Sequence, residues 1–195
     1  MKKVIAIFLV TALSLLGEEP KVVSFDKLQK RGEDGNQLYY LPDHNVPFTG
    51  KEVSYWPDGQ KKTEISYKDG KRHGLTAHWY QSGQKLSEIN YKYGKHDGLL
   101  TVWYENGQWR RTGNHLDGKM VGIWTHWYEN GQQRDEIFYM GGFMNSAIVW
   151  KPNGEQCSMT DVKAGNGMMV KYKEDGTDWL RISFKEGVMT HWRRP

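Results

Sequence analysis

Three columns of glycine recur every 24 residues through this chain, and they constrain its fold more than any other feature. One column opens each unit, the second follows an aromatic pair, and the third closes the unit. The columns are Gly50, Gly74, Gly98 and Gly122; Gly59, Gly83, Gly107 and Gly131; and Gly70, Gly94, Gly118 and Gly142. A fixed period of roughly 20–50 residues is the signature of a repeat protein, whose units stack on their neighbours.

Each unit is predicted to form one β-hairpin. A small polar residue precedes the second glycine, as in Ser82–Gly83 and Asn106–Gly107. Asn-Gly and Asp-Gly favour two-residue type I′ turns, because both central residues need positive φ. Beyond the first 17 residues no run has a useful helical period. The predicted fold class is therefore all-β: an elongated antiparallel β-meander with one hairpin of about 24 residues per repeat.

The array is predicted to contain six units over residues 50–187. The last two are worn: Trp150–Gly154 continues the pattern one residue short, and a final unit keeps the offsets of the one that opens at Gly122. Terminal repeats usually diverge because they cap the stack. We predict a capping segment at 18–49 and a C-terminal tail at 188–195.

A two-residue turn fixes the register of the strands beside it. The turn at Ser82–Gly83 would place Gly74 opposite Tyr91, and a ring can cover a strand glycine. The equivalent predicted pairs are Gly50 with Tyr67, Gly98 with His115, Gly122 with Tyr139, and Gly167 with Phe184. The same register predicts cation–π contacts, in the pairs Trp103 with Arg110, Trp127 with Arg134, and Tyr55 with Lys62.

The aromatic pairs are the candidate partner-binding residues. Consecutive strand residues face opposite sides, so one row of indole rings and one row of phenol rings should line the two faces of the sheet. The rows are Trp79, Trp103 and Trp127, and Tyr80, Tyr104 and Tyr128. They would grip a partner, or they would pack only on their ladder neighbours.

No constellation typical of catalysis is present. His78 and His126 share a column but should lie about 19 Å apart, too far for one metal ion. His73 and His96 are expected in surface loops between units. A column of Glu64, Glu88 and Glu136 is expected to be a solvated charged stripe, with members about 10 Å apart. The sequence therefore predicts a non-enzyme with no catalytic site, cofactor site or metal site.

The first 17 residues resemble a secretory signal peptide. Two lysines precede the uncharged run Val4–Leu16, which at about 1.5 Å per residue is shorter than a bilayer core. We predict export to the periplasm or medium, and the alternative is an anchor in the inner membrane. Cys157 is the single cysteine, so no internal disulfide is expected, and a buried thiol is the simplest interpretation.

The charge balance argues against nucleic acid. The formal net charge is +4, with 27 Lys and Arg against 23 Asp and Glu. A nucleic-acid-binding surface normally shows a clustered basic face. We therefore expect a protein partner, with a membrane surface or a glycan as the alternative.

The repeat "GLxxxWYENGQxxxExxYxxGKxxG" resembles the bacterial variant of the membrane occupation and recognition nexus (MORN) repeat. Residues 38–60, "LYYLPDHNVPFTGKEVSYWPDGQ", resemble the start of such proteins. Many of these chains are identified as YwqK-type antitoxins of toxin–antitoxin systems. The resemblance implies the repeat fold and admits an antitoxin role, although export would separate this chain from a toxin in the cytosol.

These observations predict a non-enzymatic, exported binding scaffold that holds a partner protein along an aromatic sheet face. The alternatives are an antitoxin-like protein of a toxin–antitoxin system and a binder of envelope glycan or lipid headgroups.

Overall fold

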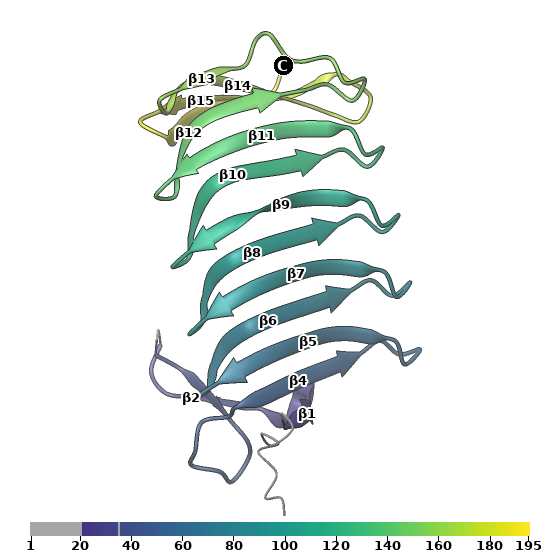
Figure 1. Cartoon of the computed structure of the whole chain (residues 1–195), viewed down its shortest axis with the longest axis vertical. Coiled ribbons are helices and arrows are strands. Elements are labelled where there is room, and N and C mark those ends of the chain that lie inside the picture. Colours follow the sequence, from purple (N-terminus) through teal and green to yellow (C-terminus); the bar gives the residue numbers. More distant parts are fainter. Residues whose placement is uncertain (1–20, 35) are drawn as a thin grey trace, which may run out of the picture.

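The computed structural model describes residues 21–34 and 36–195 (Figure 1). The predicted signal peptide at 1–17 lies outside the described residues. Within them the secondary structure is β, apart from one 3-10 turn, η1 (Phe25–Lys27). The all-β prediction is confirmed.

One sheet of 14 strands contains the whole repeat array. Its order is β1 followed by β4 to β16 in sequence, so neighbouring strands are neighbours in the chain from β4 onward. Every pair from β4 onward is antiparallel, whereas β1 runs parallel to β4. The predicted antiparallel meander is thus correct. The strands are β1 (Val22–Ser24), β4 (Gly50–Tyr55), β5 (Lys61–Lys68), β6 (Lys71–Trp79), β7 (Lys85–Lys92), β8 (Lys95–Trp103), β9 (Trp109–Leu116), β10 (Lys119–Trp127), β11 (Gln133–Met140), β12 (Phe143–Val149), β13 (Asp161–Lys163), β14 (Asn166–Tyr172), β15 (Asp178–Lys185) and β16 (Val188–Arg193).

The turns within the units are not of the predicted type I′. In the Ser82–Gly83 turn only Gly83 has positive φ. The Tyr80 N–H donates to Gln84 O, and the Gly83 N–H donates to Tyr80 O. This is a three-residue loop in which a type I turn is followed by a left-handed glycine. The type I′ turns lie instead between units, where Asp117 and Gly118 both have positive φ.

The predicted register holds away from the turns and fails beside them. Gly74 pairs with Tyr91 as expected, and so do the other glycine pairs. The three-residue loop shifts the pairing by one, and a bulge in the returning strand shifts it back. The predicted cation–π pairs were therefore wrong: Trp103 pairs with Trp109, Trp127 with Gln133, and Tyr55 with Lys61.

The opening glycines bend the strands. The register between β5 and β6 slips between Ile65 and Tyr67, at the level of Gly74, whose φ is 83°. A side chain added at Gly74 would meet only Ser66, at 3.7 Å, and not the ring of Tyr91. The pairing is thus confirmed, while cover of the glycine by the ring stays a prediction. The glycine is needed for the positive φ of a bulge, which curves the strand.

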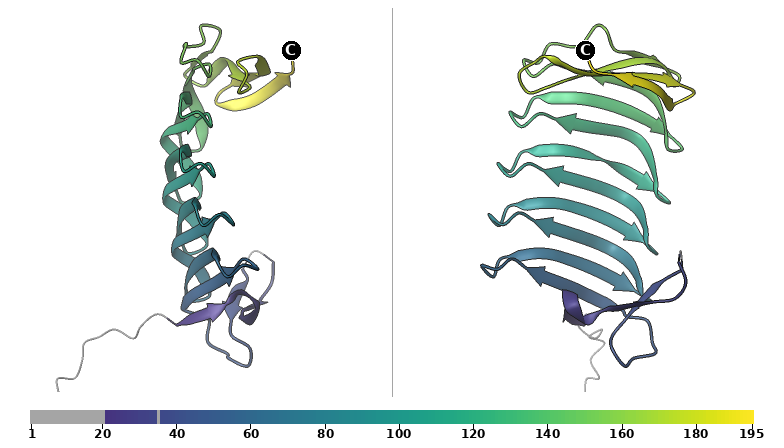
Figure 2. Two further views of the ribbon diagram at one scale, coloured as in Figure 1. Left: turned by 90° about the vertical axis from the view of Figure 1, so that its right-hand side faces the viewer. Right: turned by 180° about the vertical axis from the view of Figure 1, so that it is seen from behind.

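Both ends of the array fold onto the same face of the sheet (Figure 2). At the first end, Phe48 joins Ile65 and Tyr67 in a cluster with half-buried side chains from residues 23–41. That segment includes the small sheet of β2 (Gln29–Arg31) and β3 (Leu38–Tyr40). At the other end, Ile137 and Val149 pack against residues from the last strands.

The fold-back follows from the worn fifth unit. Its second strand, β13, has three residues and pairs with β12 through Ala147 and Val162. Strands β14 to β16 therefore swing across the end of the sheet, as seen edge-on in Figure 2. Cys157 is buried in the resulting cluster, where the Tyr172 hydroxyl lies 3.0 Å from its Sγ. This agrees with the simplest interpretation of the thiol.

We call the side that carries the two end segments the capped face and the opposite side the open face. On β6 the capped face holds Arg72, Thr76 and His78, and the open face holds Leu75 and Trp79. In the centre of the sheet, side chains of the capped face pack on one another, and Leu100, Val102 and Trp124 are buried together there. The open face has no covering layer among the described residues.

Replacing Gly118 by alanine should lower stability by about 1 kcal/mol. Gly118 has φ 85° in a type I′ turn, and a side chain there would meet no atom within 4 Å. The loss would therefore reflect backbone conformation alone. Urea unfolding measures it, with Lys119→Ala as the control for a nearby exposed change. Equal midpoints for the two variants would contradict the turn assignment.

Candidate functional site

The row of indole rings lies on the open face, beside the turns within each unit. Each ring is half-buried. The side chain that follows the turn of the preceding unit lies against it. Lys61 Nζ lies 5.2 Å from the Trp79 ring centroid, and Lys85 Nζ lies 5.8 Å from that of Trp103. At Trp127 the place of the lysine is taken by Trp109, with centroids 5.4 Å apart. The cations thus meet rings of the next unit.

Shallow pockets separate neighbouring turns along this row. One is lined by Gln60, Lys61, Trp79 and Gly83. Another, two units along the array, is lined by Gln108, Trp109, Trp127 and the glycines at 107 and 131. Because the hairpins repeat, the ridge presents the same mixture of indole and amide at regular intervals.

A second apolar feature runs parallel to the tryptophans on the open face. Its side chains are 38–56% exposed, although three of them are large aliphatic residues of strand centres. They are Leu75, Leu99, Ile123 and Phe138. Leu75, Leu99 and Ile123 occupy one repeat position, and Phe138 pairs with Ile123 across β10 and β11. An exposed apolar column of this length is typical of an interaction surface.

The row of phenol rings serves the sheet itself. Each hydroxyl donates to the main-chain carbonyl of the tryptophan column one unit on: Tyr80 to Trp103 O, Tyr104 to Trp127 O and Tyr128 to Trp150 O, at 2.8–2.9 Å. Tyr128 is 1% exposed. These contacts tie consecutive hairpins together and leave the indole row as the one that faces outward.

The glutamate column lies on the open face, where two of its three members are in ion pairs and Glu136 accepts a hydrogen bond from the Gln133 amide at 3.5 Å. Glu64 binds Lys51 and Lys61, each at 2.7 Å, and Glu88 binds Lys85. Hydrogen bonds from Lys51 and Lys61 hold the pKa of Glu64 below its usual value. An ionised carboxylate flanked by two ammonium groups is a poor general acid, so this column carries charge rather than chemistry.

The histidines lie on or beside the capped face, and two of them were misplaced by sequence reasoning. His73 and His96 belong to strands β6 and β8 and are half-buried, not in loops, because the connections between units have only two residues. A chain of edge-to-face contacts runs from Tyr91 through His96 and His115 to Trp124, with centroids 4.7–4.9 Å apart.

The electrostatic setting of these imidazoles is positive. Burial lowers the pKa of His96, and the charges of Arg72 and Arg111 lower it further. Burial, His96 and Arg111 act in the same direction on the pKa of His115. The imidazoles are therefore held neutral, and the positive charge of this region resides on the two arginines.

Asp135 is the most buried charged group, at 0% exposure. Its carboxylate lies 2.6 Å from His126 Nδ1 and accepts from Arg134 Nε at 3.0 Å. Across the residues described, no three His, Cys, Asp or Glu side chains gather as a metal site. His126 is thus occupied by Asp135. His78 lies two units away from His126, and its ring forms a hydrogen bond with Ser87.

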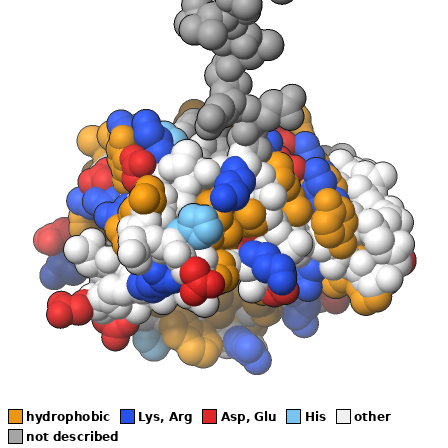
Figure 3. Space-filling view, turned by 90° about the horizontal axis from the view of Figure 1, so that it is seen from below, with side chains coloured by type: hydrophobic (Ala, Val, Ile, Leu, Met, Phe, Trp, Pro, Cys, Tyr) orange, Lys and Arg blue, Asp and Glu red, His pale blue; other side chains and the backbone are white. Residues whose placement is uncertain are grey.

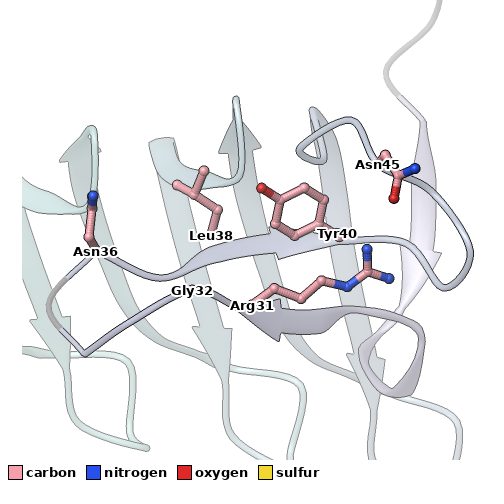
Figure 4. A pocket seen from close by; sticks show the side chains of 6 residues that line it. All are labelled: Arg31, Gly32, Asn36, Leu38, Tyr40 and Asn45. Carbon is pink, nitrogen blue, oxygen red and sulfur yellow. The ribbon is translucent and has the colours of Figure 1, made fainter.

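In a pocket of the N-terminal segment, the side chain of Arg31 is held by contacts within the protein (Figure 4). Arg31 stacks on the Tyr40 ring at 5.0 Å and donates to the carbonyls of His44 and Leu41. The side chain therefore pins the loop after β3. Seen from this end, apolar, basic and acidic side chains are intermixed (Figure 3). Among the described residues visible in this view, no patch of one charge is seen.

The family described as the MORN repeat variant matches residues 48–69, 72–93 and 120–139. Three hairpins of the chain match MORN repeats. The matched segments coincide with β4–β5, β6–β7 and β10–β11, so each match covers one hairpin. No curated protein matches the chain. The family describes a repeat-type scaffold, and among the described residues no helix has the length and apolar character to cross a membrane.

Sequence reasoning missed the buried groups of the capped face. Arg72, Asp135 and the pair of Gly113 and Trp124 were not singled out. Their signal was present as departures from the repeat: Gly113 stands where other units have isoleucine, and Asp135 where they have Ser87 or Arg111.

Proposed function

We propose that this protein is an exported, non-enzymatic MORN-repeat scaffold that holds a partner protein along its open face. The feature that carries the proposal is the pairing of two parallel rows on that face. The indole row of Trp79, Trp103 and Trp127 supplies large aromatic area, and the column of Leu75, Leu99, Ile123 and Phe138 supplies exposed apolar area. Tryptophan is enriched among the few residues that supply most of the binding energy at protein interfaces, and a contiguous exposed apolar patch marks an interaction surface.

The alternative functions account for fewer features of the structure than a protein-binding scaffold does. A glycan or lipid headgroup would use the ridge of indoles and lysines, but it leaves the aliphatic column without a role. An antitoxin role rests on the resemblance alone, and it requires that the chain stay in the cytosol. Sequencing the mature N terminus tests export: a start near Leu15 or Glu18 supports it, and a start at Met1 favours the antitoxin role.

Site-specific photocrosslinking tests the partner surface. A photoreactive phenylalanine analogue at Leu99 or Ile123 should give one discrete protein adduct in cells, and the same group at Val46, which is 75% exposed in the N-terminal segment, should not. Trp103→Ala should reduce the adduct at position 99 at least tenfold, because a buried aromatic anchor contributes about 2 kcal/mol or more, and about 1.4 kcal/mol is tenfold in affinity.

Two results would overturn the proposal. Equal adducts at Leu99 and Val46 would show that no specific surface exists. Loss of retention on liposomes or peptidoglycan in Trp103→Ala, with no protein adduct at either open-face position, would favour the headgroup or glycan alternative.

A further inference from the structure

The capped face has an uncovered stretch between its two end segments, on strands β6 to β9. The N-terminal segment packs on Ile65 and Tyr67, and the C-terminal strands pack on Ile137 and Val149. Tyr91 belongs to neither cluster, and Arg72 lies beside Tyr67 at the edge of the first one. This stretch lies on the opposite side of the sheet from the proposed partner surface.

We propose that this stretch binds an acidic polypeptide segment through Arg72 and Arg111. The proposal goes beyond the scaffold function on the open face and does not depend on it. A guanidinium group has five donors in a planar fork that matches a carboxylate. Within the described residues, the side-chain hydrogen bonds of Arg72 go to tyrosine hydroxyls, and Arg111 makes none.

In the part of the chain that the structure describes, ion pairs do not compensate the charge of this stretch, although the charge of Arg72 acts on Glu52 and counteracts part of the rise that burial causes in the pKa of that carboxyl. No ion pair within residues 21–34 and 36–195 involves Arg72 or Arg111, and the side-chain hydrogen bond of Arg72 is a long one, 3.5 Å to the Tyr91 hydroxyl. The carboxylates on the capped face of β4 to β11 are Glu52 and Asp135. Glu52 accepts from the buried Tyr67 hydroxyl at 2.8 Å, and Asp135 is held by His126 and Arg134. Neither reaches Arg111.

Arg111 meets only like charge. It is exposed, and it lies opposite Val102 on β8 and His126 on β10. Partial burial of the guanidinium by its neighbours, and the cations Arg110 and Arg134, lower its pKa. A guanidinium among other cations adds to a local positive potential, and such a potential attracts an external anion.

The spacing of the two arginines sets the size of the ligand. Arg72 is on β6 and Arg111 on β9, three strand spacings or about 14 Å apart across the sheet. They also lie in different rows, about 13 Å apart along the strands. The diagonal of about 20 Å corresponds to roughly 6 extended residues or about 13 helical ones. Ile89 and Tyr91 lie between them and favour a segment with an apolar side chain between two carboxylates.

Polypeptide is favoured over nucleic acid by the number of cations. Two arginines about 20 Å apart neutralise few phosphates, and duplex or single-stranded nucleic acid needs a continuous basic track. The exposed lysines Lys61 and Lys85, by contrast, are already paired with Glu64 and Glu88 on the other face.

Binding of a fluorescein-labelled 15-residue poly-glutamate peptide to the whole chain tests the proposal by anisotropy. The double variant Arg72→Gln/Arg111→Gln should bind at least tenfold more weakly, because each charge-assisted bond that is lost is worth about one power of ten. The matched control is Lys61→Gln/Lys85→Gln, which removes the same charge from the open face and should change affinity less than threefold. A 4-residue glutamate peptide cannot reach both arginines and should bind at least tenfold more weakly than the 15-mer.

Several outcomes would overturn the proposal. They are equal loss in the two double variants, no dependence on peptide length, or tighter binding of single-stranded DNA or of phosphatidylserine vesicles than of poly-glutamate. If the Arg72 variant fails to fold, Arg111→Gln alone should still show the loss, since its exposed side chain supports no packing. Photocrosslinking at Leu99 reads the open face separately, so failure here leaves that test intact.

Discussion

Gly113→Ile is expected to destabilise the protein by about 3 kcal/mol, the upper range for overpacking a filled core. A side-chain carbon placed on Gly113 would lie 2.2 Å from the ring of Trp124. Trp124 is 1% exposed and donates its indole N–H to Asn114 O at 3.1 Å. The ring therefore cannot move aside without losing a hydrogen bond and its packing.

The repeat itself supplies the compensating change. The same two positions are Ile89 and Leu100 in the preceding unit, where they face each other across β7 and β8. Where the third unit meets the fourth, a glycine and a tryptophan thus replace the isoleucine and leucine found one repeat earlier. Trp124→Leu alone should cost about 3 kcal/mol, because it leaves a cavity over Gly113.

The double variant Gly113→Ile/Trp124→Leu rebuilds the pair of the neighbouring unit. It should lie within about 1 kcal/mol of the wild type, so the two changes should couple by several kcal/mol. Chemical unfolding of the four proteins measures the cycle. Additive losses would show that the ring and the glycine do not occupy one shared volume.

The sequence was sufficient for the architecture because the hairpin is encoded in every unit. Turn glycines and alternating strands are local signals, and 24-residue copies of them reinforce one another. The register near the turns was not predictable from the rule used, because Ser82–Gly83 reads equally as a two-residue or a three-residue loop. The bulge that follows restores the predicted strand pairing within two residues, so Gly74 still pairs with Tyr91.

The candidate surface was predictable in part. Alternation placed Trp79, Trp103 and Trp127 on one side and the tyrosines on the other, and the hydrogen bonds of the tyrosines then single out the tryptophans. What alternation alone cannot show is which face the chain ends will cover. That depends on β13, which is too short to continue the sheet in the same direction. This tertiary effect occurs once in the chain, so the repeat gives no sequence signal for it. The uncovered stretch with Arg72 and Arg111 arises from the same event.

Asp135→Asn is expected to destabilise the fold by about 3–5 kcal/mol, the usual loss when one partner of a buried charged pair is removed. Burial raises the pKa of Asp135, but the hydrogen bond and charge of His126, with Lys171 and Arg134, outweigh it and lower the pKa to about 2. The amide would leave His126 and Arg134 without their anion at the point where the last strands cover the sheet. Glu136→Gln, the adjacent residue on the open face, is the matched control and should change stability by less than about 0.5 kcal/mol.

The same carboxylate predicts how stability depends on acid. Because the pKa of Asp135 is lower in the folded chain than its ordinary value of 3.8, the folded state favours the ionised form. Its stabilisation is complete above about pH 4 and is lost as the pH falls from 3.8 towards 2. Thermal unfolding between pH 2 and pH 5 should therefore be steeper for the wild type and for Glu136→Gln than for Asp135→Asn. Parallel curves for all three proteins would mean that the buried carboxylate does not govern the junction between the sheet and its last strands.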